Sequence, residues 1–505
     1  MNFRHSIVLL AALLLSACAT APFDFPREES YAIDASTPTA LKAAVDAWRA
    51  NHPGPSGFYP LVDGMSALGA RIRLIETAEK SIDAQYFLMK GDTAGMIFTG
   101  ALLEAADRGV RVRFLLDDIF TTVEDEELEL LNAHPNIEVR LHNPISRRGV
   151  GALNYLADFR RANRRMHNKS FTVDNQMTIV GGRNIADEYF ALRPEGEFLD
   201  LDVIGIGPVA AEVSEVFDRF WNHELSLPLE AVSQRFSAAE LETVRQRVID
   251  EFETVADSVY EGARSTPVVL DLVEDGRPLF SADAVVMTDE PDKLVNAIDV
   301  EHRVLVNQLA EVVANAEQEV IVLTPYLVPG DSGVEFWTSL AKRGVRVVIV
   351  TNSLASNNHT AVHSGYARYR KPLIEGGVEL YEARADAVTA VGEDSASQLT
   401  LHTKGLFVDR RHVFIGSLNL DPRSIDINSE MGLLIDSREM GDQLGERMDQ
   451  RLGERTYRLL LDERGKLEWH ATIDGEDVVE TSEPLASGMR KFVAFLLKIL
   501  PDSQL

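Results

Sequence analysis

The sequence has very little cysteine: Cys18 is the single one among 505 residues, which excludes an intrachain disulfide. It also lacks a long apolar run, because residues 7–15 fall far short of the ~20 that a membrane-spanning helix needs. Basic residues are scarce, with 50 Lys and Arg against 79 Asp and Glu and a formal net charge of −29. Proteins that bind nucleic acid through its phosphates normally carry a basic surface. The acidic balance therefore disfavours nucleic acid as a partner and broad electrostatic adhesion to anionic lipid.

The N-terminus has the pattern of a processing signal. Arg4 and His5 precede the short apolar run, and Leu15-Ser16-Ala17-Cys18 closes it. These last residues resemble the bacterial lipobox, which implies cleavage before Cys18 and lipidation of that residue. An ordinary signal peptide with a chance cysteine is the alternative. With Ala19 after the cysteine, the resemblance implies a lipid-anchored protein on the periplasmic side of a bacterial membrane, and it favours the outer membrane.

The rest of the sequence contains one motif twice. The first copy consists of His167, Lys169, Asp174, Gly181 and Asn184, and the second consists of His402, Lys404, Asp409, Gly416 and Asn419. Each residue of the second copy stands 235 positions after its counterpart in the first. Several residue types repeated at one fixed shift indicate a duplicated unit.

The same repeat extends to the predicted secondary structure. A strand at 81–88, a helix at 96–108 and a strand at 110–116 predict a βαβ unit with parallel strands, and 320–347 repeats this order. We therefore predict an α/β protein whose two sandwich repeats pack about a pseudo-two-fold axis. The predicted divisions are a lipoprotein signal peptide (1–18), a tether (19–50), a first half (51–225), an insertion or connector (226–290), a second half (291–460) and a C-terminal hairpin with an apolar helix (461–505).

The two motifs suit the chemistry of a phosphodiester. Residues i and i+2 of a strand share a face, so His167 points with Lys169, and His402 with Lys404. Lysines and asparagines donate to phosphate oxygens, while two histidines can supply a nucleophile and a general acid. A lone His-x-Lys more often belongs to the exposed face of a strand. The duplication at a fixed shift is what favours a catalytic role for these residues. His359 and His363 lack the glutamate of a zinc-protease motif, so we expect no metal and no cofactor.

These residues resemble the phospholipase D superfamily across both repeats. Three further stretches, 163–169, 181–190 and 421–430, are similar to the C-type, periplasm-facing cardiolipin synthases and their lipoprotein relatives, as is the ending at 500–505. The resemblance implies two phospholipase D-like halves with the active site at their interface. It also implies a metal-independent, two-step reaction through a phosphatidyl-histidine.

The resemblance assigns roles to the site residues. It implies that one histidine is the nucleophile and the other the acid/base; we expect His167 and His402 in that order, although the symmetry leaves the reverse open. The remaining expectations are phosphate contacts from Lys169, Lys404, Asn184, Asn419 and Ser417, orienting acids at Glu430 and its counterpart Asp200, and structural turn positions for Asp174 and Asp409 within the catalytic motif. Gly182 stands where the second half has Ser417, which removes a hydroxyl but leaves a backbone amide.

The function that follows is a phosphatidyltransferase that makes cardiolipin from two phospholipids, with phosphatidylglycerol or phosphatidylethanolamine as donor or acceptor. Hydrolysis of phospholipids is the near alternative; a nuclease and a non-catalytic membrane scaffold are further ones. Two regions stay open. The first contains three candidate residues for the lining of the substrate pocket, His363, Tyr366 and Arg370. The second is the apolar helix at 489–501, which either docks on its own domain or lies on a membrane surface.

Overall fold

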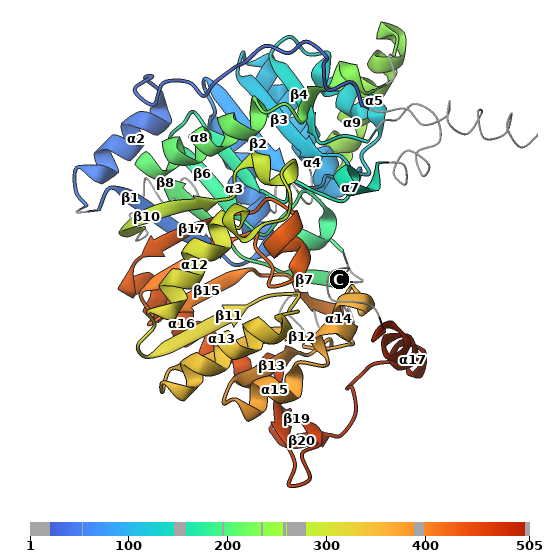
Figure 1. Cartoon of the computed structure of the whole chain (residues 1–505). Coiled ribbons are helices and arrows are strands. Elements are labelled where there is room, and N and C mark those ends of the chain that lie inside the picture. Colours follow the sequence, from blue (N-terminus) through green and yellow to red (C-terminus); the bar gives the residue numbers. More distant parts are fainter. Residues whose placement is uncertain are drawn as a thin grey trace, which may run out of the picture.

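The structure is a computed structural model that describes residues 21–499 except 53, 146–157, 194–195, 234–235, 256–258, 260–278 and 388–397. Two α/β halves lie one above the other, the first coloured blue to green and the second yellow to red (Figure 1). The expected lipidation site, Cys18, lies outside the described residues.

The first half is built on a mixed sheet with a parallel centre. In spatial order the strands are β1 (Ser56–Leu61), β8 (Asp202–Ile206), β6 (Met177–Gly181), β5 (Ser170–Val173), β2 (Ser81–Tyr86), β3 (Arg111–Asp117), β4 (Ile137–His142) and β9 (Ser226–Pro228). β2 runs parallel to β3, and β3 to β4, while the flanking strands pair antiparallel. α4 (Thr93–Asp107) connects β2 to β3, which confirms the predicted βαβ unit.

The second half repeats this topology strand for strand. In spatial order its strands are β10 (Phe280–Thr288), β17 (Met431–Asp436), β16 (His412–Gly416), β15 (Gly405–Val408), β11 (Glu319–Leu323), β12 (Arg346–Asn352), β13 (Glu379–Ala383) and β18 (Thr456–Leu461). β19 (Leu467–Ile473) and β20 (Glu476–Glu480) form the expected C-terminal hairpin and extend its edge. The two-repeat α/β fold predicted from the shift is therefore confirmed.

The two sheets are joined along β10 and share a core. The first residues of β10 pair with β1 and the later ones with β17, so this strand belongs to both sheets. Side chains from the facing sheets and from α8 (Pro208–Trp221) and α16 (Arg438–Arg455) form one continuous apolar cluster between the halves. Two further apolar clusters lie on the outer faces of the sheets, one in each half.

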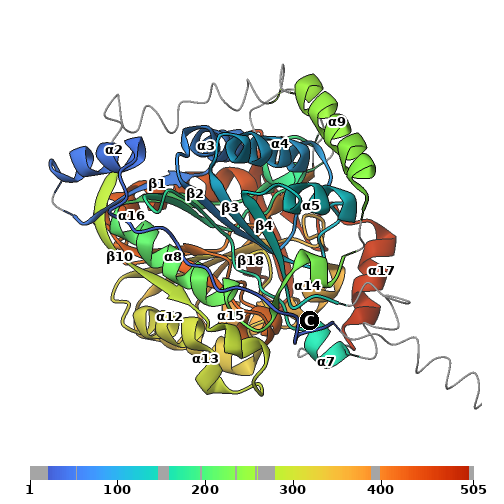
Figure 2. The same ribbon diagram turned by 90° about the horizontal axis from the view of Figure 1, so that it is seen from above.

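Helices cover the outer faces. Figure 2 shows α3, α4 and α5 over one face of the first sheet, with α8 on the opposite side. α9, which comes from the predicted insertion, packs against α4 and α5. The remaining helices are α2 (Ala40–Arg49), α3 (Gly64–Thr77), α5 (Asp125–Asn132), α7 (Phe159–Ala162), α9 (Ala238–Val255), α12 (Val304–Ala314), α13 (Gly330–Lys342), α14 (Thr360–Tyr366), α15 (Arg370–Glu375) and α17 (Gly488–Leu497).

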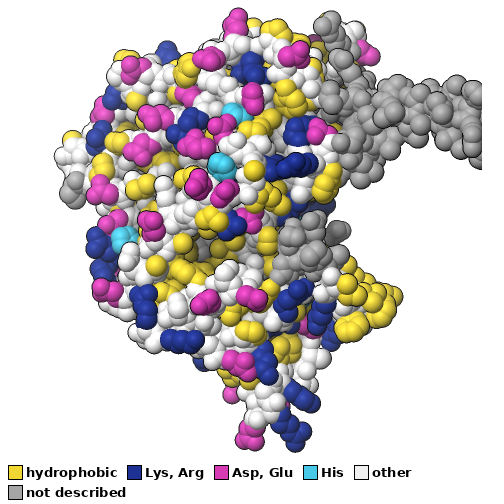
Figure 3. Space-filling model, viewed as in Figure 1, with side chains coloured by type: hydrophobic (Ala, Val, Ile, Leu, Met, Phe, Trp, Pro, Cys, Tyr) yellow, Lys and Arg dark blue, Asp and Glu magenta, His cyan; other side chains and the backbone are white. Residues whose placement is uncertain are grey.

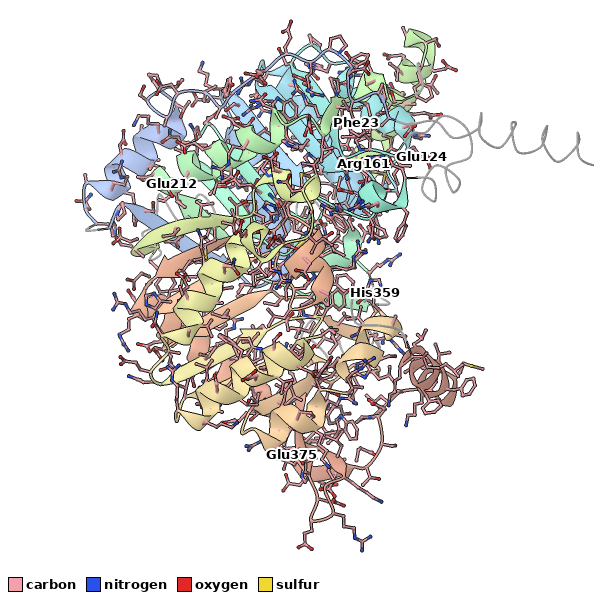
Figure 4. All side chains as sticks on the ribbon, viewed as in Figure 1. Phe23, Glu124, Arg161, Glu212, His359 and Glu375 are labelled. Carbon is pink, nitrogen blue, oxygen red and sulfur yellow. The ribbon has the colours of Figure 1, made fainter. Side chains whose placement is uncertain are left out.

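The predicted tether at 19–50 is wrong for its described part. Phe23 and Phe25 pack against the first apolar cluster, and Phe23 lies under the guanidinium of Arg161 (Figure 4). The segment also supplies acceptors: Nη1 of Arg113 donates to the carbonyl of Ser30 at 2.7 Å. These contacts are made with elements that are distant in the sequence. The lack of a helical or strand period in this stretch was therefore no guide to whether it is exposed to solvent.

The aspartates of the two motifs hold turns in place. Asp174 has φ +50° and Asp409 has φ +52°, and each lies just after its motif strand. The carboxylate of Asp174 accepts the backbone amides of residues 79–81, and that of Asp409 accepts those of residues 317–319. These bonds attach each motif hairpin to the start of the neighbouring parallel strand, a placement that fits the structural role expected of them.

Replacing Asp174 with asparagine should therefore lower stability without altering the catalytic groups directly. The neutral amide cannot accept all three backbone donors as strongly, so we expect the free energy of unfolding to fall by about 2 kcal/mol. Chemical denaturation measures the change. Asp331→Asn, at an exposed aspartate on α13, is the matched control. Equal stability of the two variants would contradict the role given to Asp174.

Candidate active site

The two motifs meet where the halves are joined through their backbones. β7 (Gly196–Leu199) of the first half pairs in parallel with β14 (Gln398–Leu401) of the second. The amide of His402 donates to the carbonyl of Leu199 at 2.7 Å, and the amide of His167 donates to that of Ser429 at 3.0 Å. The histidine of each motif is thus hydrogen-bonded through its own main chain to the opposite half.

The side chain of each histidine also contacts a residue of the opposite half. Nδ1 of His167 lies 2.8 Å from a carboxylate oxygen of Glu430, and Nδ1 of His402 lies 2.6 Å from one of Asp200. Both carboxylates are buried and belong to the half that does not carry the histidine. A carboxylate at Nδ1 fixes the tautomer with the proton on that nitrogen and leaves the lone pair on Nε2. Both expected orienting acids are therefore in contact with a histidine.

Aromatic rings enclose both imidazoles. Phe87 contacts His167 edge-on with ring centroids 4.7 Å apart. Phe198 stacks on His402 at 5.0 Å, and Tyr189 contacts the same ring edge-on at 5.1 Å. Sequence reasoning missed these three residues, because nothing in their local pattern separates them from ordinary core aromatics.

The lysines lie beside the histidines. Nζ of Lys169 donates to the carbonyl of His167 at 2.6 Å. Nζ of Lys404 donates to the carbonyl of His402 and lies 2.8 Å from Nδ1 and 3.0 Å from Nε2 of the same ring. Both lysines are 1% exposed, so their charges have almost no contact with water. Two buried cations next to two imidazoles form a site suited to a phosphate anion.

Burial sets the protonation states of the empty site. It lowers the pKa of His167 to about 4 and that of His402 to about 3, so both imidazoles are neutral near pH 7. Burial also lowers the pKa of Lys169 to about 7 and that of Lys404 to about 8. A bound phosphate adds negative charge nearby and raises all four pKa values. Substrate binding itself can therefore allow one histidine to become the acid.

The Gly182 and Ser417 difference follows from the two carboxylates. A Cβ at Gly182 would stand 2.1 Å from Oδ1 of Asp200, so no side chain fits there. At the corresponding place in the second half, the hydroxyl of Ser417 donates to Glu430 and accepts the amide of Met431. Ser417 was expected to bind phosphate, but its hydroxyl is engaged in holding the carboxylate that orients His167.

The two halves also differ in the hydrogen-bond donors that they can offer to a phosphate. The amide group of Asn184 donates to the hydroxyl of Tyr189 at 2.9 Å, and its oxygen accepts the amide of Leu88. Asn419 is buried, and its side-chain amide makes no hydrogen bond within the described part of the chain, so its Nδ2 is free to donate. The backbone amides of Gly182 and Ser417 donate to carbonyls of the neighbouring strand segment. Lys169, Lys404 and Asn419 are therefore the donors available to a phosphate.

His363, Tyr366 and Arg370 take part in a separate buried network. Arg370 donates to Glu382 at 2.7 Å and to Glu483 at 2.6 Å, and its Nη2 lies 2.9 Å from Nε2 of His363. Tyr366 donates to the same Glu382. These residues connect α14 and α15 to the C-terminal segment and have no contact with the catalytic histidines.

Two α/β repeats that each bring a His–Lys pair to their interface define a protein of the phospholipase D type. A family profile described as "Cardiolipin synthase, PLD-like domain" matches residues 72–221 and 309–452, and the chain belongs to that family. It is therefore a phosphatidyltransferase of the phospholipase D superfamily. This confirms the resemblance found in the motifs.

Individual proteins are similar over most of the chain. Cardiolipin synthase C of Escherichia coli (strain K12) is 38% identical over 466 residues, which cover 91% of this chain and 98% of that protein. An uncharacterized protein of Helicobacter pylori (strain ATCC 700392 / 26695) is 31% identical over 461 residues, 90% of each chain. The crystal structure of phosphatidylserine synthase from Haemophilus influenzae Rd KW20 has the same fold, with a TM-score of 0.54 at 18% identity over 84% of this chain and 92% of that one.

Substituting Gly182 with alanine should disable the site through Asp200. The new Cβ must displace the carboxylate that holds His402, and a displacement of this kind lowers turnover by about 10- to 100-fold. Head-group release from phospholipid, with a thermal melt to check folding, measures the effect. Gly453→Ala is the matched control, because a Cβ at Gly453 meets no other atom within 4 Å. Full activity of folded Gly182→Ala would disprove this account of the Gly182–Asp200 contact.

Anion binding should weaken as the pH rises from about 6 to about 9, because Lys169 and Lys404 are cationic below their lowered pKa values and lose their charge above them. Calorimetric titration with sulfate, whose own charge is constant over this interval, measures the affinity. Lys404→Met should reduce binding at the lower pH, whereas Lys371→Met, at an exposed lysine, should not. An affinity independent of pH would contradict the assignment.

Proposed function

We propose that this chain synthesises cardiolipin by transferring a phosphatidyl group between two phospholipids. The observation that carries the proposal is the pair of buried imidazoles, each held at Nδ1 by a carboxylate of the opposite half and each beside a lysine. The similarity to cardiolipin synthase C over 91% of the chain supports the same choice of reaction.

In the first step Nε2 of His167 attacks the phosphorus of the donor lipid. A P–N bond forms, the bond from phosphorus to the head-group oxygen breaks, and the departing oxygen takes a proton from His402. In the second step His402 removes a proton from a hydroxyl of phosphatidylglycerol, and that oxygen attacks phosphorus. The P–N bond breaks, and cardiolipin leaves. Glycerol is the first product if phosphatidylglycerol is the donor, and ethanolamine if phosphatidylethanolamine is.

One contact favours His167 as the nucleophile. Nε2 of His167 has no hydrogen-bond partner among the described residues, whereas Nε2 of His402 lies 3.0 Å from Nζ of Lys404. Both orienting carboxylates accept a second hydrogen bond, Glu430 from Ser417 and Asp200 from the amide of Leu201, so both imidazoles are held in place. A firmly oriented imidazole with a free lone pair suits nucleophilic attack.

Hydrolysis is the second candidate, because water at the second step would release phosphatidic acid from the same intermediate. A nuclease is disfavoured by the net charge of −29. A non-catalytic scaffold is disfavoured by the complete set of His, Lys and carboxylate groups in both halves. We also propose that Cys18 carries a lipid anchor at the periplasmic side of a bacterial membrane, which would bring the site to its substrates.

Expression in a host without cardiolipin synthases should restore cardiolipin, measured by mass spectrometry of extracted lipids. His167→Ala and His402→Ala should both fail to do so, because each removes a group that both steps need. His134→Ala, at a histidine outside the site, should behave like the wild type. Accumulation of phosphatidic acid in place of cardiolipin would identify a hydrolase and overturn the proposal.

The same variants separate the roles of the two histidines. A diester with a nitrophenolate leaving group does not need an acid in the first step. With this substrate His402→Ala should release one equivalent of nitrophenolate in a rapid burst and keep an acid-labile phosphatidyl group, whereas His167→Ala should give no burst. A burst from His167→Ala would reverse the assignment.

A further inference from the structure

The C-terminal helix α17 presents a continuous apolar face to solvent. Its outward side chains, together with that of Ile499 just beyond it, are between 37% and 87% exposed, and in Figure 3 the helix is the hydrophobic projection at the lower right. Ala494 is the residue of this helix that is buried. A helix docked on its own domain normally buries its apolar face, and α17 does the opposite. The exposed side chains are Met489, Phe492, Val493, Phe495, Leu496 and Ile499.

Polar contacts hold α17 in this orientation. Arg490, on the inner face, donates to the carbonyls of Ala355 and Asn357. At the other end, Arg368 donates to the carbonyl of Lys498 at 3.1 Å. The segment before the helix is fixed by the ion pair of Glu483 with buried Arg370. The apolar face therefore points outward because both ends of the helix are attached through the inner side.

Charge and length point to a lipid surface as the occupant. Residues 488–499 contain Arg490, Lys491 and Lys498 and no acidic residue, although the whole chain has a net charge of −29. An apolar face flanked by basic residues is typical of helices that lie in a membrane interface. The ten residues of α17 span only about 15 Å, half of the ~30 Å hydrocarbon core. Among the described residues, no helix has the length and apolarity to cross a membrane.

The loop that holds α17 also holds the strand before His402. The carbonyl of Ala355, which accepts from Arg490, also accepts from Gln398 at the start of β14. Further along that strand, Thr400 donates to the carbonyl of Ser356 at 2.8 Å. His359, at the end of this loop, lies in the region between the two halves in Figure 4. α17 and β14, the strand before His402, are thus attached to one short segment, residues 352–359.

We propose that α17 inserts its apolar face into the surface of a phospholipid bilayer and holds the His402 side of the active site against it. The proposal rests on the proposed function for the identity of the substrate lipids. Insertion itself is independent of turnover and can be measured without it. In this arrangement a lipid substrate passes from the bilayer to the interface of the two halves without crossing water.

A single labelled cysteine tests insertion. In the full chain with Cys18→Ser, Phe495→Cys provides one thiol on the apolar face for an environment-sensitive fluorophore. Vesicles of phosphatidylglycerol and phosphatidylethanolamine should shift its emission to the blue and protect it from iodide. The matched control is Val479→Cys on β20, which is 49% exposed and should stay accessible to iodide. An unshifted, iodide-accessible label at position 495 would overturn the proposal, as would a shift that depends on protein concentration without vesicles, since a second copy would then cover the face.

Activity on two forms of substrate separates this inference from the proposed function. Phe492→Gln with Phe495→Gln should reduce head-group release from vesicles several-fold and leave release from a monomeric short-chain phospholipid unchanged. Ile298→Gln, at an exposed apolar residue far from α17 in the sequence, should change neither rate. Equal losses on both substrates would reject a membrane role for α17. A label that inserts in a protein without transferase activity would reject only the proposed function.

Discussion

The crossed pairing of histidines and carboxylates is the interaction on which the rest of the molecule depends. Neither half by itself orients its own motif histidine, because His167 is held by Glu430 and His402 by Asp200. The two lysines, two imidazoles and two carboxylates are all buried, and buried ionic groups are costly unless each has a well-placed partner. The shared strand β10, the pairing of β7 with β14 and the common apolar cluster keep the halves in the single register that provides those partners.

The two carboxylate environments explain why the halves have diverged. Asp200 is one methylene shorter than Glu430, and it occupies the volume that a side chain at position 182 would need. Glu430 leaves room for Ser417, whose hydroxyl then becomes a second donor to the carboxylate. The equivalent space is thus filled by Gly182 with Asp200 in the first half and by Ser417 with Glu430 in the second. The second hydrogen bond to each carboxylate then comes from a different donor, the Ser417 hydroxyl for Glu430 and the Leu201 amide for Asp200, so the symmetric fold produces a chemically unsymmetric site.

The ends of the described chain show how burial depends on available partners. Residues 21–37 have no regular period, yet they pack on the first half because buried arginines there need carbonyl acceptors and an apolar cluster has room for Phe23 and Phe25. α17 is strongly apolar, yet it remains exposed because its attachments are polar and lie on its other side. Hydrophobicity of a segment alone predicts neither outcome.

The sequence by itself determined the duplication, the parallel βαβ units, the position of each motif and the family, because all of these are local patterns repeated at one shift of 235 residues. Tertiary structure alone decided which acid serves which histidine, since the paired residues are 263 and 202 positions apart. It also decided that Ser417 supports Glu430, that Asn184 is engaged by Tyr189 and that residues 21–37 are packed on the first half. The physical reason is that a side chain's role depends on its spatial neighbours, and at this interface each motif histidine takes its orienting carboxylate from the other half.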